Sequence, residues 1–252
     1  MAASPGQGLM DSFELLEIWV YLAESPLLGL TLTLLAYIAG VRCYQASGGN
    51  PLVNPVAIAI IIIMLCLALS GTAFQTYFEG AQFVHFLLGP ATVAFAVPLY
   101  QQLGRLRALA LPMFVGVLGG VLAGTASSVV LARLLGASTD TALSLAPKSM
   151  TTPIAMGVSE HIGGLPSLTA VLVISTGIIG ASFGTRLFAL LRIEDDAVKG
   201  IAMGLNAHGI GTARAFQVSP QMGAFSGLGM ALMAFIGPLI VPSLLSFLGF
   251  LD

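Results

Sequence analysis

Residues 168–184 read LTAVLVISTGIIGASFG and contain no charged side chain. Residues 57–70, AIAIIIIMLCLALS, form a second stretch of this kind. With their flanks, each extends to the about 20 apolar residues that a helix needs to cross a bilayer. A barrel strand would instead alternate apolar and polar residues over about ten positions. Because lipid admits only helices and closed barrels, these stretches predict an all-α, polytopic transmembrane helical bundle.

The composition of the chain agrees with these stretches. Hydrophobic residues make up 57% of its 252 residues and charged residues 8%, whereas a soluble domain has about 25% charged residues. A net charge of −2 without a basic cluster gives no indication of nucleic-acid binding. Cys43 and Cys66 suggest neither a disulfide framework nor a metal site. We therefore expect a multi-pass membrane protein without a cofactor or a metal.

The chain is predicted to consist of an N-terminal extension, residues 1–26, and a transmembrane domain, residues 27–252. The extension holds four acidic and no basic residues, so it lacks the basic start of a cleavable signal peptide. Its segment FELLEIWVYLAESP (13–26) predicts a short interfacial helix. By the length rule, the transmembrane domain is predicted to contain about eight membrane segments, at 27–42, 53–75, 80–102, 108–135, 140–160, 165–191, 197–217 and 221–248.

Three of these segments are interrupted by proline, glycine, hydroxyl or basic residues. They are GPATVAFAVPLY (89–100), APKSMTTPIAM (146–156) and NAHGIGTARAF (206–216). Proline and glycine clusters free backbone groups that lipid cannot satisfy, so such segments belong where protein or a wet cavity receives them. Discontinuous helices of this kind build the midplane substrate sites of many secondary transporters. We therefore expect broken or re-entrant helices that point inward.

Two of the broken segments are part of a weak pattern that occurs twice in the sequence. Pro90 is followed by a second proline and then by a Gly-rich stretch at 111–136. Pro147 is likewise followed by a second proline and then by a Gly-rich stretch at 165–192. This pattern predicts a transporter-type internal repeat.

The basic residues orient the predicted segments. Short loops rich in Lys and Arg stay in the cytoplasm, which places the acidic start outside and Arg42, Arg105 and Arg107 inside. Arg186 and Arg192 also lie inside if segment 140–160 is re-entrant, and outside if it crosses fully. The rule favours the re-entrant form, and a continuous crossing of this broken segment stays open.

Lys148 lies within the second broken segment. A lysine at the centre of a membrane helix costs about 2.5 to 3.5 kcal/mol, so it needs a partner, a water-filled cavity or a function. A lysine that snorkels to the headgroups is the alternative. The loosened backbone and the hydroxyls on the same turn favour a binding site. Its predicted members are Lys148, Ser149, Thr151, Thr152 and Pro153.

The second cluster is NAHGIGTAR, residues 206–214. On a continuous helix His208 and Arg214 would face different ways, but the glycines between them permit an unwound turn that brings them together. The alternative places Arg214 near the headgroups and gives His208 a hydrogen bond within the core. The candidate binding residues here are Asn206, His208, Gly209, Gly211, Thr212 and Arg214, with Pro90 and Thr92 added from the first broken segment.

The interior of the predicted segments holds cations without acids. Lys148 and Arg214 are basic, and no Asp or Glu lies within the apolar body of any segment. This balance favours an anionic ligand over a sodium site made of carboxylates, and arginine can hold a carboxylate through two parallel hydrogen bonds. Proton coupling would fall to His208. An enzyme is not expected, because no nucleophile has a base at a telling spacing.

At these residues the chain resembles the LrgB/CidB family, which includes the plastidic glycolate/glycerate translocator. The resemblance runs from about residue 27 to the C-terminus and implies a multi-pass protein of the bacterial inner membrane. It also implies a small holin-like partner of the LrgA/CidA type. Asn206 and Ala207 depart from the family, whose members usually have small residues ending in serine there. The resemblance rests on PATVAFAVPLY (90–100), PKSMTTPIAM (147–156), IGGLP (162–166) and HGIGTAR (208–214).

Two functions follow from the residues and the resemblance together. We predict a secondary carrier of a small monocarboxylate such as glycolate, glycerate or pyruvate, which works by alternating access and holds the carboxylate with Lys148 and Arg214. The alternative is a holin-associated regulator of murein hydrolase activity and cell lysis with no substrate of its own. The expected partners are the bilayer, the carboxylate and the LrgA/CidA-type protein, and homo-oligomerisation is left open.

Overall fold

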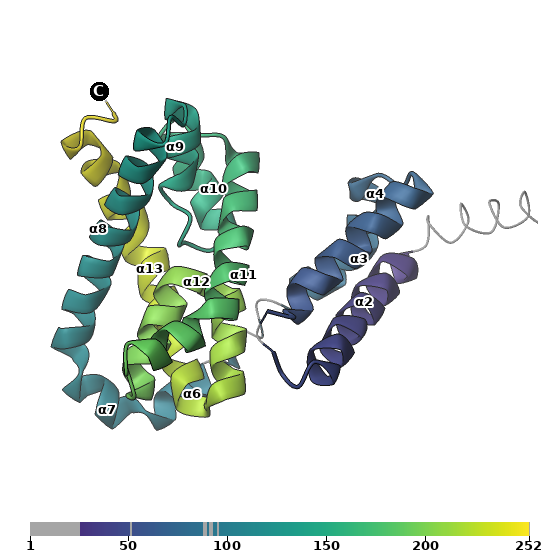
Figure 1. Ribbon diagram of the computed structural model, residues 1–252, viewed down its shortest axis with the longest axis horizontal. Helices are drawn as coiled ribbons and strands as arrows, with labels where there is room; N and C mark the ends of the chain where they lie inside the picture. The colour runs from purple at the N-terminus through teal and green to yellow at the C-terminus, as the bar shows by residue number, and fades with distance from the viewer. Residues whose placement is uncertain (1–25, 51, 88–89, 91–92, 95, 252) are drawn as a thin grey trace, which may run out of the picture. The chain divides into compact units, whose positions relative to one another are not determined.

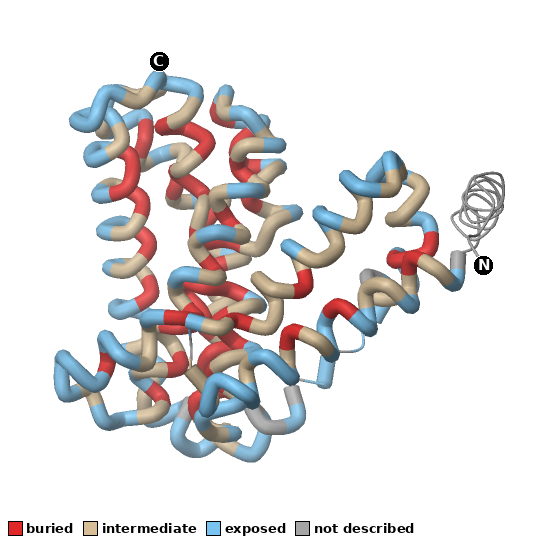
Figure 2. The backbone as a smooth tube through the Cα atoms, turned by 45° about the vertical axis from the view of Figure 1, so that its right-hand side comes forward, coloured by how far each residue is buried: buried red, intermediate tan, exposed pale blue. Residues whose placement is uncertain are grey.

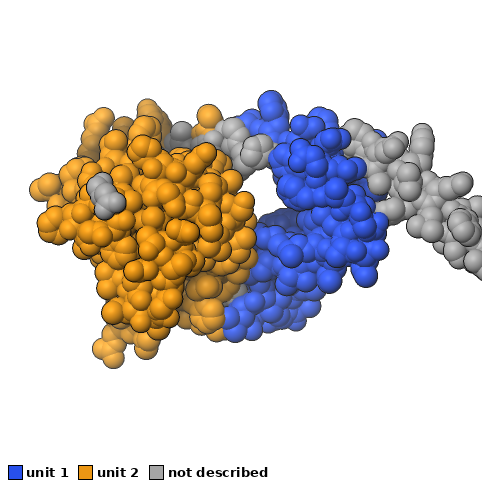
Figure 3. Space-filling view, turned by 90° about the horizontal axis from the view of Figure 1, so that it is seen from above, with its two compact units in different colours: residues 1–91 blue, residues 92–252 orange. Residues whose placement is uncertain are grey.

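The computed structural model of the chain describes residues 26–50, 52–87, 90, 93–94 and 96–251. The regular structure in these ranges is helical, as the sequence predicts. The interfacial helix predicted within residues 13–26 and the candidate residue Thr92 lie outside the described residues. The chain divides into two compact units, residues 1–91 and residues 92–252, which Figure 3 colours separately.

Four of the described helices are long and apolar enough to cross a membrane. The eight spans predicted from sequence are not confirmed, because the other helices are shorter, less apolar or bent. The outward side of the long helices carries large apolar side chains, among them Leu111, Phe235 and Leu239, each more than 70% exposed. Such a surface fits lipid and not water. The four candidate spans are Leu27–Ala46, Ala110–Leu134, Pro166–Leu190 and Pro220–Phe247.

The first unit is built from α2 (Pro26–Ala46), α3 (Pro55–Ser70) and α4 (Phe74–Phe86). The side chain of Asn54 starts α3 by accepting hydrogen bonds from the backbone N–H groups of the second and third helical residues, which have no partner within the helix. Gly29 lets α2 approach α4 closely, because a Cβ atom there would overlap the Tyr77 carbonyl oxygen. Thr33 and Tyr77 add a hydroxyl–hydroxyl hydrogen bond of 2.8 Å between the same helices.

In the second unit, three long helices run through the body and two broken segments lie among them (Figure 1). Buried residues gather on the inward sides of these helices (Figure 2). The elements in chain order are α6 (Ala96–Gln101), α7 (Leu103–Ala108), α8 (Ala110–Leu134), α9 (Thr139–Leu145), α10 (Thr152–His161), α11 (Pro166–Leu190), α12 (Asp196–Val218) and α13 (Pro220–Phe247).

Helices α9 and α10 form a hairpin, which we call the first hairpin (139–161), with residues 146–151 as its tip. Pro147 and Pro153 cause the break, because proline and the residue before it disfavour the interior of a helix. The Thr169 hydroxyl of α11 lies 3.0 Å from the Ser144 carbonyl oxygen and 2.7 Å from Ser159 Oγ. One side chain of α11 therefore contacts both arms. The structure gives segment 140–160 the doubled-back form that the basic residues favour.

Helix α12 is a second hairpin. A straight helix of its 23 residues would be about 35 Å long. Yet Ser219 Oγ, just past its end, donates a hydrogen bond of 2.7 Å to Asp196 Oδ2 at its start. The reversal occurs at His208, whose φ of 39° and ψ of −134° are not helical. We call residues 196–207 and 209–218 the first and second arms of this second hairpin, and His208 its tip.

The two hairpins start at opposite ends of the second unit. An ion pair between Arg105 and Asp195 brings the start of the second hairpin next to the segment that precedes α8. The first hairpin instead follows the other end of α8. Figure 1 agrees, with α9 and α10 at the end of the body opposite α7.

Both tips reach the middle of α8. A Cβ atom at Gly120 would overlap the side chain of Leu205, three residues before the tip of the second hairpin. The Thr125 hydroxyl lies 3.4 Å from the carbonyl oxygen of Ala146 in the tip of the first. Gly120 and Thr125 flank the centre of this 25-residue helix and are about 7.5 Å apart along its axis. The hairpins therefore end at nearly the same depth.

The close packing of the second hairpin against α13 gives a testable prediction. A Cβ atom at Gly204 would overlap the Ser226 carbonyl oxygen, whereas one at Gly119 in α8 would meet no atom within 4 Å. We expect Gly204→Ala to destabilise the protein by about 1 to 3 kcal/mol through overpacking. Gly119→Ala should be neutral or stabilising by up to about 1 kcal/mol, because alanine favours a helix. Thermal unfolding in detergent measures both, and equal midpoints for the two variants would contradict the packing.

Candidate functional site

The tip of the first hairpin carries Lys148. Its side chain is half-buried, and its Nζ donates a hydrogen bond of 3.1 Å to the buried Ser149 Oγ. Among the described residues the ion pairs are Arg105–Asp195 and Lys199–Asp196, so no described carboxylate pairs with Lys148. A half-buried ammonium group that is hydrogen-bonded to a neutral hydroxyl can still attract an anion.

The other predicted residues of this cluster begin α10. Thr151 and Thr152 are half-buried, and Pro153 is exposed. Thr151 precedes the helix without a side-chain hydrogen bond to its first turn. The N-terminal end of α10 therefore lies next to Lys148 in the chain, and the first N–H groups of a helix favour negative charge.

The tip of the second hairpin is held by hydrogen bonds. His208 is 5% exposed, and its Nε2 lies 2.9 Å from the Val173 carbonyl oxygen in α11, to which it must donate. The Thr212 hydroxyl lies 2.9 Å from both the His208 carbonyl oxygen and Ser226 Oγ. His208 thus has the core hydrogen bond that was its alternative interpretation from sequence. Ser226, which sequence reasoning left out of the site, is fully buried beside Thr212.

The remaining residues of the second cluster differ in surroundings. Gly211 is closely packed against the first arm, because a Cβ atom at this position would lie 3.0 Å from the Met203 carbonyl oxygen. Gly209, immediately after the break, has open space around it. Asn206 is exposed and donates a hydrogen bond of 3.0 Å to the Ala202 carbonyl oxygen. The reversal therefore depends on Gly211 for its close approach and occurs at His208, not at either glycine.

Arg214 lies in a different place from Lys148. It is on the second arm, where its Nη1 donates a hydrogen bond of 3.0 Å to Gln217 Oε1. It lines a hollow of about 210 Å³ together with Lys199 of the first arm and with the end of α11. Lys148 does not line this hollow, and no described contact joins Lys148 to Arg214. The structure thus brings Arg214 together with Lys199, a pairing that the sequence alone did not suggest.

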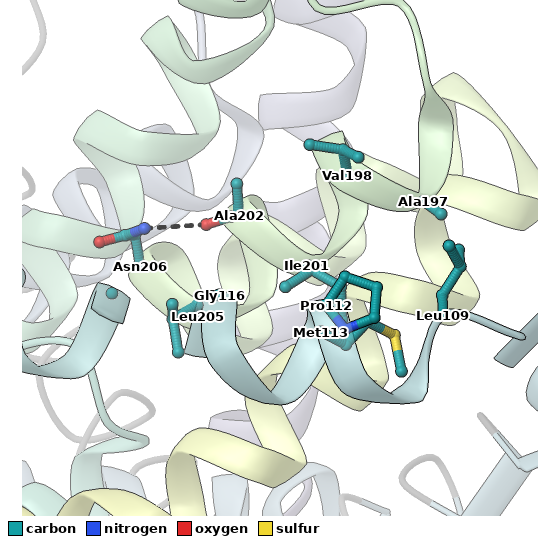
Figure 4. Close-up of a pocket in the computed structure, with 11 residues that line it drawn as sticks. Leu109, Pro112, Met113, Gly116, Ala197, Val198, Ile201, Ala202, Leu205 and Asn206 are labelled. Carbon is teal, nitrogen blue, oxygen red and sulfur yellow. Dashed lines mark hydrogen bonds between the residues drawn. The ribbon is translucent and has the colours of Figure 1, made fainter. Parts of the chain in front are cut away.

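A larger hollow of about 340 Å³ lies between α8 and the first arm of the second hairpin (Figure 4). Its polar side chain is that of Asn206, near the tip. The rest of the lining is apolar, so a carboxylate would lose most of its hydration there with only the Asn206 amide as a partner. We do not place an anion in it. Its lining consists of Leu109, Pro112, Met113, Gly116, Gly120, Ala197, Val198, Ile201, Ala202, Leu205 and Asn206.

The first broken segment contributes little to the described site. Pro90 is exposed, and Thr92 is outside the described residues. Within the described ranges, no group of three or more His, Cys, Asp or Glu residues is arranged to hold a metal ion. The described candidates are therefore those at the two hairpin tips and in the hollow beside Arg214.

Comparison with known proteins gives a match over nearly the whole chain. The sequence profile of the LrgB-like family matches residues 33–247. The chain is 35% identical to the protein YwbG of Bacillus subtilis (strain 168), covering 88% of this chain and 98% of that protein. It is 32% identical to the holin-like protein CidB of Staphylococcus aureus (strain N315), covering 87% of this chain and 95% of that protein. No solved structure matches the chain.

The base of the second hairpin is the place where Asp196 contacts Ser219 and Lys199. The Asp196 carboxylate should make the stability of the protein depend on pH. Hydrogen bonds from Ser219 and Lys199 hold the pKa of Asp196, which lies outside the four spans, below its usual value of about 3.9. The folded state therefore favours the charged carboxylate. This stabilisation is complete above the unfolded-state pKa and is lost as the pH falls through the lower folded-state pKa.

We expect the wild-type melting temperature to fall more steeply than that of Asp196→Asn between about pH 5 and pH 2. The control is Asp140→Asn at the other end of the unit, because no described hydrogen bond or ion pair involves the Asp140 carboxylate. Melting curves in detergent measure the slopes. Parallel curves for wild type and Asp196→Asn would show that the Ser219 and Lys199 hydrogen bonds do not matter.

Proposed function

The chain belongs to the LrgB-like family of multi-pass membrane proteins, and we propose that it is a secondary carrier of a small organic anion, working by alternating access. The observation that carries the proposal is the convergence of two broken hairpins on the middle of α8, one through Leu205 and one through Ala146. Helix breaks at such depth are tolerated where they line a cavity, and they form the midplane sites of many transporters.

The proposed binding site lies at the two tips. Lys148 would hold the carboxylate, and the hydroxyls of Ser149, Thr151 and Thr152 would bind the hydroxyl or keto oxygen of an acid such as glycolate, glycerate or pyruvate. The N-terminal end of α10 begins at this tip, and the second arm begins immediately after His208. Two positive helix ends would therefore add to the charge of Lys148.

The residues of the second tip would support the site and couple it to protons. His208 uses Nε2 for the Val173 carbonyl oxygen, which leaves Nδ1 as the nitrogen that can take up a proton. Thr212 and Ser226 tie the second arm to α13. Gly209, which has open space around it, would keep the backbone next to the tip open to the ligand, and Gly211 would permit the close approach of the two arms.

Alternating access would use the two hairpins in turn. Each follows a 25-residue helix, α8 for the first and α11 for the second, and they start at opposite ends of the unit. We infer that α8 with the first hairpin and α11 with the second form an inverted repeat. Repeats of this type allow a site at their interface to open to either side of the membrane.

A second candidate function comes from the names of relatives. The CidB proteins of two staphylococci are called holin-like. On this reading the chain would regulate murein hydrolase activity and cell lysis with an LrgA/CidA-type partner and would carry no substrate. A carrier saturates with substrate and performs counterflow, whereas a pore or a gating subunit does neither.

The carrier proposal predicts a loss of transport in Lys148→Met. Hydrogen bonds to charged groups are worth about 1.5 to 3 kcal/mol, so kcat/KM for the best of glycolate, glycerate and pyruvate should fall about 10-fold to 150-fold. Arg107→Gln, which removes a charge from an exposed position, is the control and should transport normally. Uptake of labelled acid into proteoliposomes measures both. Unsaturable flux would refute the carrier, and unchanged uptake by Lys148→Met would refute the role of Lys148 in binding.

The role of His208 is tested by His208→Gln, which can still donate a hydrogen bond to Val173 but cannot take up a proton. We expect uptake driven by an inward proton gradient to fall to the rate seen without a gradient. Substrate counterflow at constant pH should be retained. Equal stimulation of wild type and variant by the gradient would remove His208 from the coupling.

A further inference from the structure

The hollow beside Arg214 lies between the tip and the base of the second hairpin. Its lining includes Lys199, Arg214, Thr185, Phe188 and Val218. Arg214 is six residues beyond His208 and Lys199 nine residues before it, about 9 and 14 Å along their arms. The hollow therefore lies nearer to the Asp196–Ser219 hydrogen bond at the base than to the tip.

The hollow is at the basic end of the second unit. Arg105, Arg107, Arg186, Arg192 and Lys199 belong to this end, with Glu194, Asp195 and Asp196 as its acids. The opposite end has Arg133 with the acids Asp140 and Glu160. Because short loops rich in Lys and Arg stay in the cytoplasm, this rule assigns the end of the unit that holds the hollow to the cytoplasmic side.

The side chains of the hollow suit an anion. Arg214 and Lys199 both line the hollow. Arg214 donates a hydrogen bond to the amide oxygen of Gln217, and Lys199 shares its charge with Asp196 at 3.0 Å. Thr185 adds a hydroxyl from α11. A volume of about 210 Å³ corresponds to about seven water molecules at about 30 Å³ each. A two- or three-carbon acid fits with some of its water.

We propose that this hollow is a second anion site, on the cytoplasmic side of the tips, which binds the carboxylate of the substrate before or after it occupies the Lys148 site. The inference rests on the proposed carrier function for its substrate class. It separates the two cations that the sequence had placed around one carboxylate. Arg214 and Lys199 would raise the local concentration of the anion at one mouth of the pathway, and Lys148 would hold it at the centre.

Sided transport tests the proposal. In proteoliposomes of uniform orientation made from neutral lipid, Arg214→Gln should raise the KM for glycolate about 10-fold from the cytoplasmic side and less than 2-fold from the other, with kcat unchanged. Arg214→Lys should largely restore the KM, and the surface variant Arg107→Gln should leave it unaltered. A KM that rises equally from both sides, or from neither, would overturn the assignment.

Direct binding separates failure of this site from failure of the carrier. Purified Lys148→Met protein, titrated with sodium glycolate against sodium chloride of equal ionic strength, should keep a saturable rise in melting temperature. The double variant Lys148→Met/Arg214→Gln should lose it. Without a saturable rise in Lys148→Met, or with the same rise in both proteins, the second site does not exist, whatever the transport assay gives.

A lipid phosphate is the other source of an anion at this depth. Short-chain phosphatidylglycerol replaces glycolate in the same titration, with short-chain phosphatidylcholine as the neutral control. A substrate site should respond to glycolate and not to phosphatidylglycerol. An Arg214-dependent response to phosphatidylglycerol alone would make the hollow a lipid site and refute the proposal.

Discussion

The second unit depends on satisfying the backbone at two helix breaks in its interior. Where a helix breaks, carbonyl groups lose their partners, and in a membrane interior no lipid can replace them. At each break, a threonine hydroxyl donates a hydrogen bond to a carbonyl oxygen of the tip. The Thr125 hydroxyl of α8 donates a hydrogen bond to the carbonyl oxygen of Ala146 in the first tip, and the Thr212 hydroxyl donates one to the carbonyl oxygen of His208 in the second. His208 in turn donates to Val173 of α11, so the polar groups of the breaks are tied to the surrounding spans.

Small residues make this arrangement sterically feasible. A Cβ atom at Gly200 or Gly204 of the first arm would overlap the backbone of α13, and one at Gly237 of α13 would come within 2.6 Å of the Met150 side chain. Dispersion contacts, rather than the hydrophobic effect, drive association of helices in lipid, and they need close approach. The glycines thus let α13 serve as the common support for both tips. The hydroxyls of Thr125, Thr212 and Ser226, which join the tips to α8 and α13, are buried.

The sequence predicts the class of the protein and the location of the breaks better than their geometry. Charge content and apolar runs are enough for a helical membrane protein, and Pro147, Pro153 and the residues around His208 mark both tips. The number of spans is not recoverable from length, because residues 139–161 and residues 196–218 are each 23 positions long. A hairpin of two half-helices and a single crossing then look alike. Helical periodicity predicts neighbouring side chains only along a continuous helix. It therefore gives no indication that Arg214 lies near Lys199, because the chain reverses at His208 between them.

The contact between Met150 and Gly237 has a consequence for biogenesis. During synthesis, the first hairpin leaves the ribosome well before the helix that supports its tip has been made. A segment bearing an ammonium group and several hydroxyls must therefore wait near the headgroups, or in the protein-conducting channel, until α13 arrives. Insertion of the three spans and burial of the polar tips are thus separate stages, and the later one is completed only when α13 has been made.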